Sequence, residues 1–217
     1  MRPWAATSAE YHMSTSRALH EQFGEIDIYV FDQLLKGRFD SARRVLDAGC
    51  GEGRNLAYLL ASGRECFGID RAPEAIDDIR ALAARVAPAL PATNFVAGQI
   101  DALPWPGATM DVVICSAVLH FARDDEHFDR MVREMWRVLA PGGMLFARLA
   151  STIGIESSVQ FLQGRRARVP DGSERFVVDE AMLMEYTRAL GGALLDPIKT
   201  TVVQQQRAMT TWVVRKA

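Results

Sequence analysis

One segment, Val45-Leu46-Asp47-Ala48-Gly49-Cys50-Gly51-Glu52-Gly53-Arg54-Asn55, joins an apolar run to an acid and three alternating glycines. Glycine takes positive φ in a tight turn. Without a Cβ it also lets backbone N–H groups approach a ligand closely. The segment therefore predicts a strand that delivers a small ligand to the start of a helix.

The spacing of the glycines limits the ligand. A dinucleotide fingerprint, G-x-G-x-x-G/A, counted from Gly49 would need Gly or Ala where the chain has Arg54. A P-loop would need Lys and then Ser or Thr where Arg54-Asn55 stand, and Glu52 adds a negative charge that a triphosphate would resist. Phosphate ligands are thus disfavoured, and a nicotinamide oxidoreductase is the weaker alternative.

A second acid lies at a suitable distance from the glycines. The run Arg64–Ile69 reads as the next strand, and Asp70 follows it, 19 residues after Gly51. An acid at this place accepts hydrogen bonds from ribose hydroxyls in nucleoside-binding α/β folds. It can also cap the following helix. Asp70 therefore supports a nucleoside ligand without choosing among cofactors.

With Leu46-Asp47 before it, the G-x-G-x-G segment resembles the first motif of the class I S-adenosylmethionine-dependent methyltransferases. The resemblance runs from about residue 40 to 150 and is closest to the small-molecule, type 11-like branch. Three further segments carry it: Phe95–Trp105 matches the third-strand segment, Met110–Phe121 the fourth strand and its loop, and Leu139–Gly143 the turn into the fifth strand. With the strand that ends at Asp70 these segments make five ordered matches, which are more specific than one glycine loop.

The resemblance implies the cofactor S-adenosylmethionine and a set of residues that bind it. The implied cofactor-binding residues are Asp47, Gly49, Cys50, Gly51, Gly53, Asp70, Arg71, Gln99, Ile100 and Ser116. Gln99 stands where the family has an acid on the adenine amino group, with Asp101 as a substitute. A Gln carbonyl can accept the same bond. Asp47 and the glycines also have purely structural readings, as a partner of loop amides and as a strand-to-helix turn.

Two residues are candidates for the acceptor side. His120 follows the fourth strand, at the edge where open α/β sheets bind ligands, and imidazole titrates near neutrality. It is a candidate base or acceptor-binding group, or a surface histidine near a helix start. Arg148 lies inside the predicted fifth strand, where a charge needs a partner. It binds either an anionic acceptor or a neighbouring acid.

The hydrophobic pattern predicts an alternating α/β domain with a doubly wound, Rossmann-like sheet of seven strands, mostly parallel with an antiparallel C-terminal strand. Predicted strands lie near 43–48, 65–69, 93–97, 110–116 and 143–150, and two apolar runs, 193–200 and 207–215, form an antiparallel pair. Predicted helices lie near 54–62, 72–86, 126–139 and 179–190. The polar stretch 157–174 reads as a loop, with Arg165, Arg166 and Arg168 solvated.

Residues 14–217 are predicted to form a single methyltransferase domain, with a Rossmann-like core at 40–217. Residues 14–39 are predicted to be a helical cap with an apolar stripe, Ile28, Phe31, Leu34 and Leu35. The cap either packs on the sheet or covers the cofactor and shapes the acceptor pocket. Residues 1–13 show no period and are predicted to be disordered.

Composition narrows the class of protein. A chain of 217 residues with 49% hydrophobic content builds one domain with a substantial core. A net charge of −2 gives no general attraction to nucleic acid or to an anionic membrane. The three cysteines lack the spacing of a metal site, so no metal is predicted. The cysteines and the lack of an apolar stretch approaching ~20 residues together predict a cytoplasmic protein.

These observations predict methyl transfer to a small molecule by in-line displacement. The positively charged donor is already activated, so a dedicated base is optional. Cys115-Ser116-Ala117-Val118 follows the fourth strand, where amino-methylating enzymes carry an Asn-Pro-Pro-Tyr or Asp-Pro-Pro-Tyr segment, so DNA bases and protein glutamine are disfavoured acceptors. The alternative is a non-catalytic, regulatory binder of S-adenosylmethionine or S-adenosylhomocysteine. The sequence sets neither the acceptor nor the oligomeric state.

Overall fold

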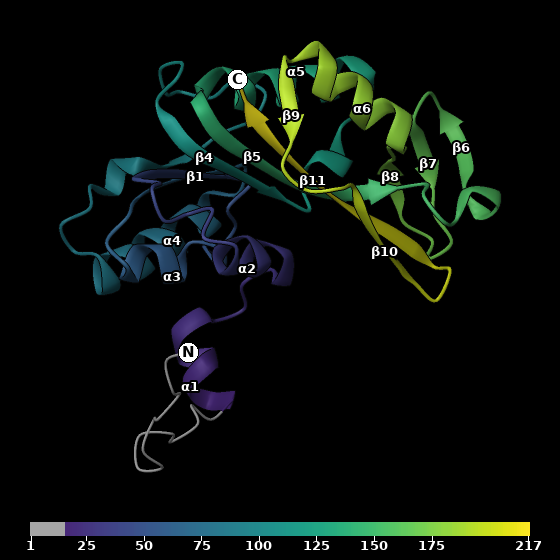
Figure 1. Ribbon diagram of the computed structural model, residues 1–217. Coiled ribbons are helices and arrows are strands. Elements are labelled where there is room, and N and C mark those ends of the chain that lie inside the picture. Colours follow the sequence, from purple (N-terminus) through teal and green to yellow (C-terminus); the bar gives the residue numbers. More distant parts are fainter. Residues whose placement is uncertain (1–15) are drawn as a thin grey trace, which may run out of the picture.

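The computed structural model describes residues 16–217, so the predicted disorder of residues 1–13 lies outside the described part. A mixed sheet forms the centre, and Figure 1 shows helices on both of its faces. The strands are β1 (Arg44–Ala48), β2 (Glu65–Asp70), β3 (Phe95–Ala97), β4 (Met110–Ser116), β5 (Leu139–Ser151), β9 (Gly192–Leu194), β10 (Lys199–Val203) and β11 (Arg207–Lys216). This arrangement confirms the predicted Rossmann-like fold.

The strand order is β10-β11-β5-β4-β1-β2-β3, and β9 also pairs with β11. Strands β1 to β5 are mutually parallel, and β11 is antiparallel to β5, as predicted. The predicted strand 193–200 is divided into β9 and β10, which both lie along β11. Pro197 lies between them, and proline cannot donate a ladder hydrogen bond.

Two apolar layers hold the helices to the sheet. On one face pack α2 (Ile28–Leu35), α3 (Ala57–Ala61) and α4 (Pro73–Val86), and on the other pack α5 (Asp125–Val138) and α6 (Glu180–Ala189) (Figure 1). Short 3-10 turns occupy η1 (Ala92–Asn94), η2 (Leu119–Phe121) and η3 (Glu156–Ser158). None of the helices in residues 16–217 has the length and apolar character that crossing a membrane requires.

Helix α5 shows how the sequence pattern becomes structure. Asp124 caps its start, because the side chain accepts a hydrogen bond from the backbone N–H of His127 at 2.7 Å. Its apolar residues, at a helical spacing, are buried, and Phe128 stacks on Phe176 with ring centroids 4.8 Å apart. Burying each large apolar side chain contributes about 1.5–3 kcal/mol, so this face fixes α5 on the sheet.

Helix α3 is shorter than the predicted helix at 54–62. It begins at Ala57, because the chain makes turns after Gly53 and uses the Asn55 side chain elsewhere. The amide of Asn55 bonds both to the backbone N–H of Asp27, at 3.1 Å, and to Asp47. Long-range polar contacts therefore replace the first helical turn.

The prediction of a solvated loop at 157–174 was wrong. A second, antiparallel sheet stands there, made of β6 (Gln160–Gln163), β7 (Arg166–Arg168) and β8 (Glu174–Phe176). Ala167 is fully buried between two arginines, and Arg168 donates to Glu174 at 2.8 Å. A three-residue strand shows too little alternation for its period to be recognised in the sequence.

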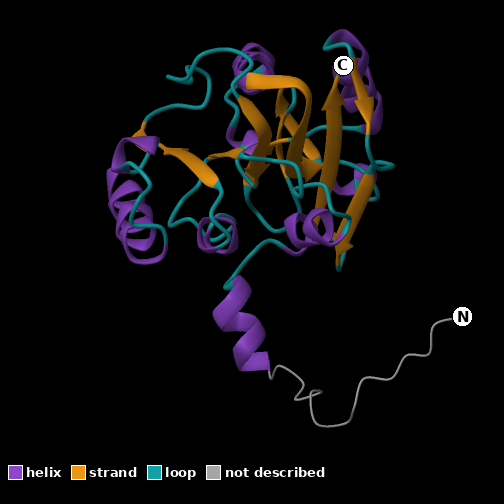
Figure 2. Ribbon diagram, turned by 60° about the vertical axis from the view of Figure 1, so that its left-hand side comes forward, coloured by secondary structure: helices purple, strands orange, loops and turns teal. Residues whose placement is uncertain are grey.

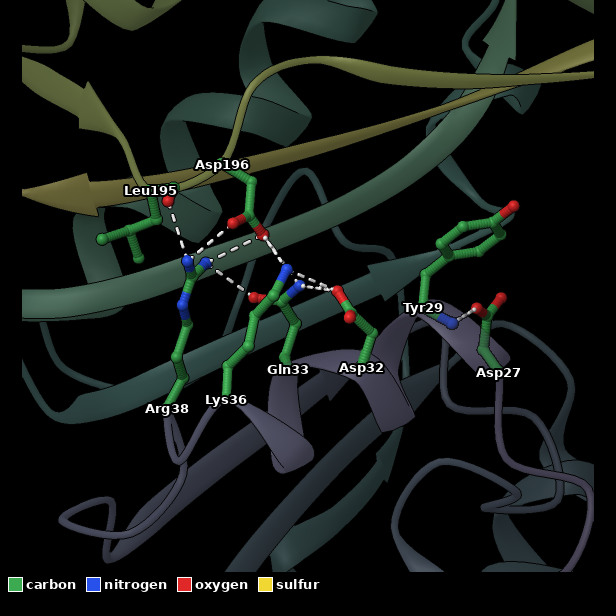
Figure 3. Close-up of polar contacts among 8 residues, drawn as sticks. All are labelled: Asp27, Tyr29, Asp32, Gln33, Lys36, Arg38, Leu195 and Asp196. Carbon is green, nitrogen blue, oxygen red and sulfur yellow. Dashed lines mark hydrogen bonds and ion pairs between the residues drawn. The ribbon is translucent and has the colours of Figure 1, made fainter.

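The apolar stripe predicted for the N-terminal cap is only partly confirmed: Leu34 packs against the core, but Ile28 and Leu35 do not. In α2 the buried residues are Val30 and Gln33, whereas Ile28 is 66% and Leu35 is 73% exposed. Polar contacts tie α2 to the sheet edge, as Figure 3 shows around Asp196. Arg38 donates to both carboxylate oxygens of Asp196, at 2.7 and 3.0 Å, and Gln33 donates at 3.0 Å. Helix α1 (Ser16–Phe23) stands away from the sheet in Figures 1 and 2.

Candidate functional site

The glycine loop after β1 turns sharply across the end of β2. The N–H groups of Gly49 and Cys50 both bond to the carbonyl of Ile69, at 2.8 and 3.0 Å. Gly49, Gly51 and Gly53 all have positive φ, +87°, +50° and +88°. A Cβ at Gly49 would overlap the Val118 side chain. A Cβ at Gly51 would have no neighbour within 4 Å, so Gly51 leaves the approach to the loop open.

A cavity of about 770 Å³ lies against this loop, beyond the carboxyl ends of β1, β2 and β4. Nine of the ten predicted cofactor-binding residues line it: Gly49, Cys50, Gly51, Gly53, Asp70, Arg71, Gln99, Ile100 and Ser116. This is the edge at which open α/β sheets bind their ligands. Asp47, His120 and Arg148 do not line it.

Asp70 is held rigidly at the wall of the cavity. Its two carboxylate oxygens accept hydrogen bonds from the backbone N–H groups of Gly51 and Ala72, each at 3.0 Å. Ala72 precedes the first turn of α4, so Asp70 also supports the helix start. The N-cap residue of α4 is Ala72, so Asp70 is not the helix cap. Its anchored carboxylate keeps lone pairs for hydroxyl donors in the cavity, and the ribose contact stays a prediction.

Asp47 is buried behind the loop. The side chain is fully shielded from solvent, Oδ2 accepts from Asn55 Nδ2 at 3.3 Å, and Oδ1 has no partner. Burial raises the pKa of this carboxyl to about 7, although the bond from Asn55 and the charge of Arg54 oppose the shift. The predicted alternative of loop amides as its partners is replaced by a side-chain amide. Asp47 therefore lies behind the cavity wall and does not line the cavity.

The far wall contains Gln99 and Ile100, as predicted. Asp101, the proposed substitute for Gln99, is engaged elsewhere: its Oδ2 lies 3.5 Å from His127 Nε2 and 3.6 Å from Arg130 Nε. His127 itself lines the cavity. Gln99 therefore keeps the place that the prediction gave it.

A buried polar cluster lies beside the cavity, around Asp27. Its Oδ2 accepts from Ser116 Oγ at 2.8 Å and from Arg148 Nη1 at 3.3 Å, and lies 3.7 Å from Arg54 Nη2. The guanidinium of Arg148 also stands 5.0 Å from the centre of the Tyr29 ring. Of the two readings of Arg148, the structure shows the one with an acid partner, and its Nε is buried without a hydrogen bond.

His120 lies in η2 with 6% of its surface exposed, so it is not a surface histidine. Its Nδ1 is buried and has no hydrogen-bond partner. Burial lowers the pKa of the ring to about 4, and the positive charges of Arg175 and Arg148 act in the same direction. The imidazole is therefore neutral at pH 7 and a weak base.

Several cavity residues were not among the predicted set. Glu25, Arg54, Phe121, His127 and Met131 line it as well. The helical spacing of the apolar residues in α5 predicts that Met131 is buried. It does not predict that Met131 also borders the cavity. Glu25 precedes α2 in a segment with no motif. Arg54 directly follows the glycines, and this position could have identified it as a residue of the cavity.

Comparisons with known proteins agree with this geometry. A family model described as a methyltransferase domain matches residues 46–147. An uncharacterised methyltransferase of Mycobacterium tuberculosis is 33% identical over 105 residues, which are 48% of this chain and 39% of that protein. The chain thus spans well under half the length of this relative.

Two solved structures share the fold. The 1,6-didemethyltoxoflavin-N1-methyltransferase of Burkholderia thailandensis, crystallised with S-adenosylhomocysteine, superposes with a TM-score of 0.66 at 20% identity, covering 93% of this chain and 82% of that one. The [4+2]-cyclase SpnF gives the same TM-score at 19% identity, covering 86% and 80%. At these identities the likeness concerns the fold alone.

The matched residues, 46–147, contain the glycine loop, Asp70, Gln99 and Ser116, so the family match covers most of the wall of the cavity. A relative in Mycolicibacterium smegmatis, 32% identical over 113 residues that make up 52% of this chain and 40% of that protein, is named a probable S-adenosylmethionine-dependent methyltransferase. Residues 46–147, just under half of this chain, match the methyltransferase-domain family.

Proposed function

We propose that the protein transfers a methyl group from S-adenosylmethionine to a small-molecule acceptor. One observation carries the proposal: the open glycine loop, the anchored Asp70 carboxylate and Gln99 border a single cavity at the carboxyl edge of the sheet. Each group has a counterpart on the cofactor, and the acceptor itself is not specified by them.

The residues present fit this cofactor. Gly51 leaves room for a ligand against the loop, Asp70 offers acceptors to ribose hydroxyls, and Gln99 offers a carbonyl to the adenine amino group. Glu52, which lines the cavity, adds negative charge near a ligand that carries an ammonium and a sulfonium. Cys50, Gly53, Arg71, Ile100 and Ser116 complete the proposed binding surface.

The bound cofactor supplies an electrophilic methyl group on sulfur. The chain has to align the attacking atom and exclude water, and orientation of this kind lowers a barrier by up to about 7–11 kcal/mol. Arg148 and His120 are the proposed acceptor-side residues, since they lie at the carboxyl end of β5 and just beyond β4. A ring with a pKa of about 4 is a poor base, so we assign His120 to acceptor contact.

Calorimetric titration with S-adenosylhomocysteine tests the cofactor assignment, with NAD and ATP as competitors of the wrong class. Asp70→Asn should weaken S-adenosylhomocysteine by about tenfold, because the amide loses acceptor strength toward hydroxyls. Asp77→Asn, on the exposed side of α4, is the matched control and should bind as the wild type does. Tighter binding of NAD than of S-adenosylhomocysteine would refute the assignment.

A second candidate is a non-catalytic binder of the same cofactor that serves as a regulator. It is favoured by one observation: Asp27 bonds to Ser116 and Arg148, and the proposed acceptor-side residues do not line the cavity. A screen of small molecules for formation of S-adenosylhomocysteine from S-adenosylmethionine separates the two candidates, because only an enzyme gives turnover.

The proposed compartment is the cytoplasm, and the proposed acceptor is neither nucleic acid nor a membrane lipid. The support for the first is that Cys50, Cys66 and Cys115 are buried free thiols, and burial raises the pKa of each. The support for the second is a net charge of −2 and a pI of about 6.1.

A further inference from the structure

The Asp27 carboxylate occupies a site built from three separate elements. Its Oδ2 is approached by Ser116 at the end of β4, by Arg148 in β5 and by Arg54 in the loop after β1. Only 3% of the Asp27 side chain is exposed. The sheet edge next to the methyl-donor cavity thus forms a receptor for a carboxylate, and an acid of the chain itself fills it.

Asp27 does not use the full capacity of this site. Arg148 gives it a single hydrogen bond at 3.3 Å, whereas arginine commonly binds carboxylates through two parallel bonds. Arg148 Nε and His120 Nδ1 are both buried without partners. Unpartnered buried polar atoms are uncommon in folded proteins and call for an explanation such as an absent ligand.

Two arginines lie close to His120, beside the Asp27 site. The guanidinium groups of Arg148 and Arg175 both lie close enough to His120 for their charges to act on its ring. Arg175 Nη1 donates a hydrogen bond to the backbone carbonyl of Glu174. The Arg175 guanidinium lies 5.1 Å from the centre of the Phe121 ring, and Phe121 borders the cavity. Arg54 and Arg148 contact Asp27, and Arg175 brings a further positive charge near His120. An anion that replaces Asp27 meets the same two arginines.

We propose that the methyl acceptor carries an anionic group, a carboxylate or a phosphate, and that this group replaces the Asp27 carboxylate on Arg148 and Ser116. This inference rests on the proposed function, and it names the substrate class. Ser116 lines the donor cavity, so an anion bound there holds the acceptor beside the methyl group.

The segment that carries Asp27 is suited to such an exchange. It is the short connection between α1 and α2, and it contains Gly24, which has φ of +59° and no atom within 4 Å of its Cβ position. Figures 1 and 2 show α1 standing away from the sheet. Replacing one carboxylate by another conserves the charge on Arg148. Asp27 also caps α2, because its Oδ1 accepts from the Tyr29 N–H at 2.9 Å, so the exchange has to move only Oδ2 away from Arg148 and Ser116.

The His120 ring reports directly on the site, because its buried Nδ1 lies beside the two arginines. Carbon and nitrogen NMR signals of His120, assigned with His120→Gln, should be followed while acetate, phosphate or neutral acetamide is added at constant ionic strength. The protein should be saturated with S-adenosylhomocysteine. We expect acetate or phosphate to shift the His120 signal saturably and acetamide to leave it unchanged. The anion that binds tighter identifies the acceptor group.

Three variants make the result specific. Arg148→Gln should weaken anion binding by about tenfold or more, and Arg148→Lys should restore part of the affinity. Asp27→Asn should raise the affinity for the anion, because the side chain that competes for Arg148 loses its charge. Arg133→Gln, with an exposed arginine on α5, is the matched control. Melting temperatures of all variants establish that they are folded.

The two proposals fail in different ways. Absence of S-adenosylhomocysteine binding overturns the proposed function, while the anion titration still reads out on the free protein. Normal binding of S-adenosylhomocysteine with no anion-dependent shift of His120 overturns the anionic acceptor. A large loss of S-adenosylhomocysteine affinity in Asp27→Asn would assign Asp27 to the donor and also overturn the exchange.

Discussion

Asp47→Asn is expected to stabilise the free protein at neutral and alkaline pH. Asp47 is fully buried, one of its oxygens has no partner, and the other accepts a single bond from Asn55. Burial raises its pKa from 3.8 to about 7. The folded protein therefore holds a proton that the unfolded chain releases at lower pH.

The magnitude follows from this difference between the two states. The contribution of Asp47 to stability is complete below pH 3.8 and is lost as the pH rises through about 7. A difference of about 3 pKa units corresponds to a loss of about 4 kcal/mol, at 1.36 kcal/mol for each unit. Asparagine does not titrate, and its amide places N–H where the protonated acid has O–H, so the variant escapes most of the loss.

Urea denaturation at several values between pH 4 and pH 8 measures the effect. The free energy of unfolding of Asp47→Asn minus that of the wild type should increase with pH and then level off. Asp77→Asn, at an exposed acid on α4, controls for the general effect of removing a negative charge. Parallel pH profiles for Asp47→Asn and the wild type would refute the reasoning, because they would mean that the buried carboxyl titrates alike in both states.

Two further predictions concern the loop and the η2 turn. Gly49→Ala forces a Cβ against Val118 at a φ of +87° and should lower the free energy of unfolding by about 2–4 kcal/mol in urea. Gly51→Ala, with space around its Cβ, should lower it by only about 1–2 kcal/mol and mainly weaken S-adenosylhomocysteine in calorimetry; equal destabilisation would contradict this division. The wild type loses about 3 kcal/mol of unfolding free energy through His120 as the pH falls from 6.5 through about 4, and His120→Gln should escape this loss. Urea denaturation at pH 7 and pH 4.5 measures it, and an equal loss of unfolding free energy in the variant and the wild type would contradict it.

The part of the fold that was predictable follows from short-range rules. Helix α5 has a cap at Asp124 and a strong 3.6-residue period, so its bounds were predicted within one residue. The glycines and Asp70 were found because strand ends of parallel sheets meet at one edge. These features need only the local sequence and one general property of the sheet.

The misplaced features depend on single long-range contacts. Gln33 is buried on α2 because Asp196, far along the chain, accepts its amide hydrogen. When a polar residue lies on the inner face of a helix, the stripe of apolar residues no longer predicts which face is buried. In the same way, β7 is recognisable only once Ala167 is seen buried against its neighbours. The period of apolar residues in a sequence predicts which positions are buried. It does not predict which distant residue a buried polar side chain will contact.

The candidate site divides along the same line. The donor side is made of strand ends and the loop after β1, and nine of its ten predicted residues line the cavity. The proposed acceptor side consists of Asp27 from the N-terminal segment, Arg148 from β5 and Arg175 from the smaller sheet, and no motif connects them. A common cofactor needs the same strand ends in every such protein, whereas an acceptor is recognised by added segments. The substrate class of this protein is therefore to be sought in residues 24–35 and 152–178.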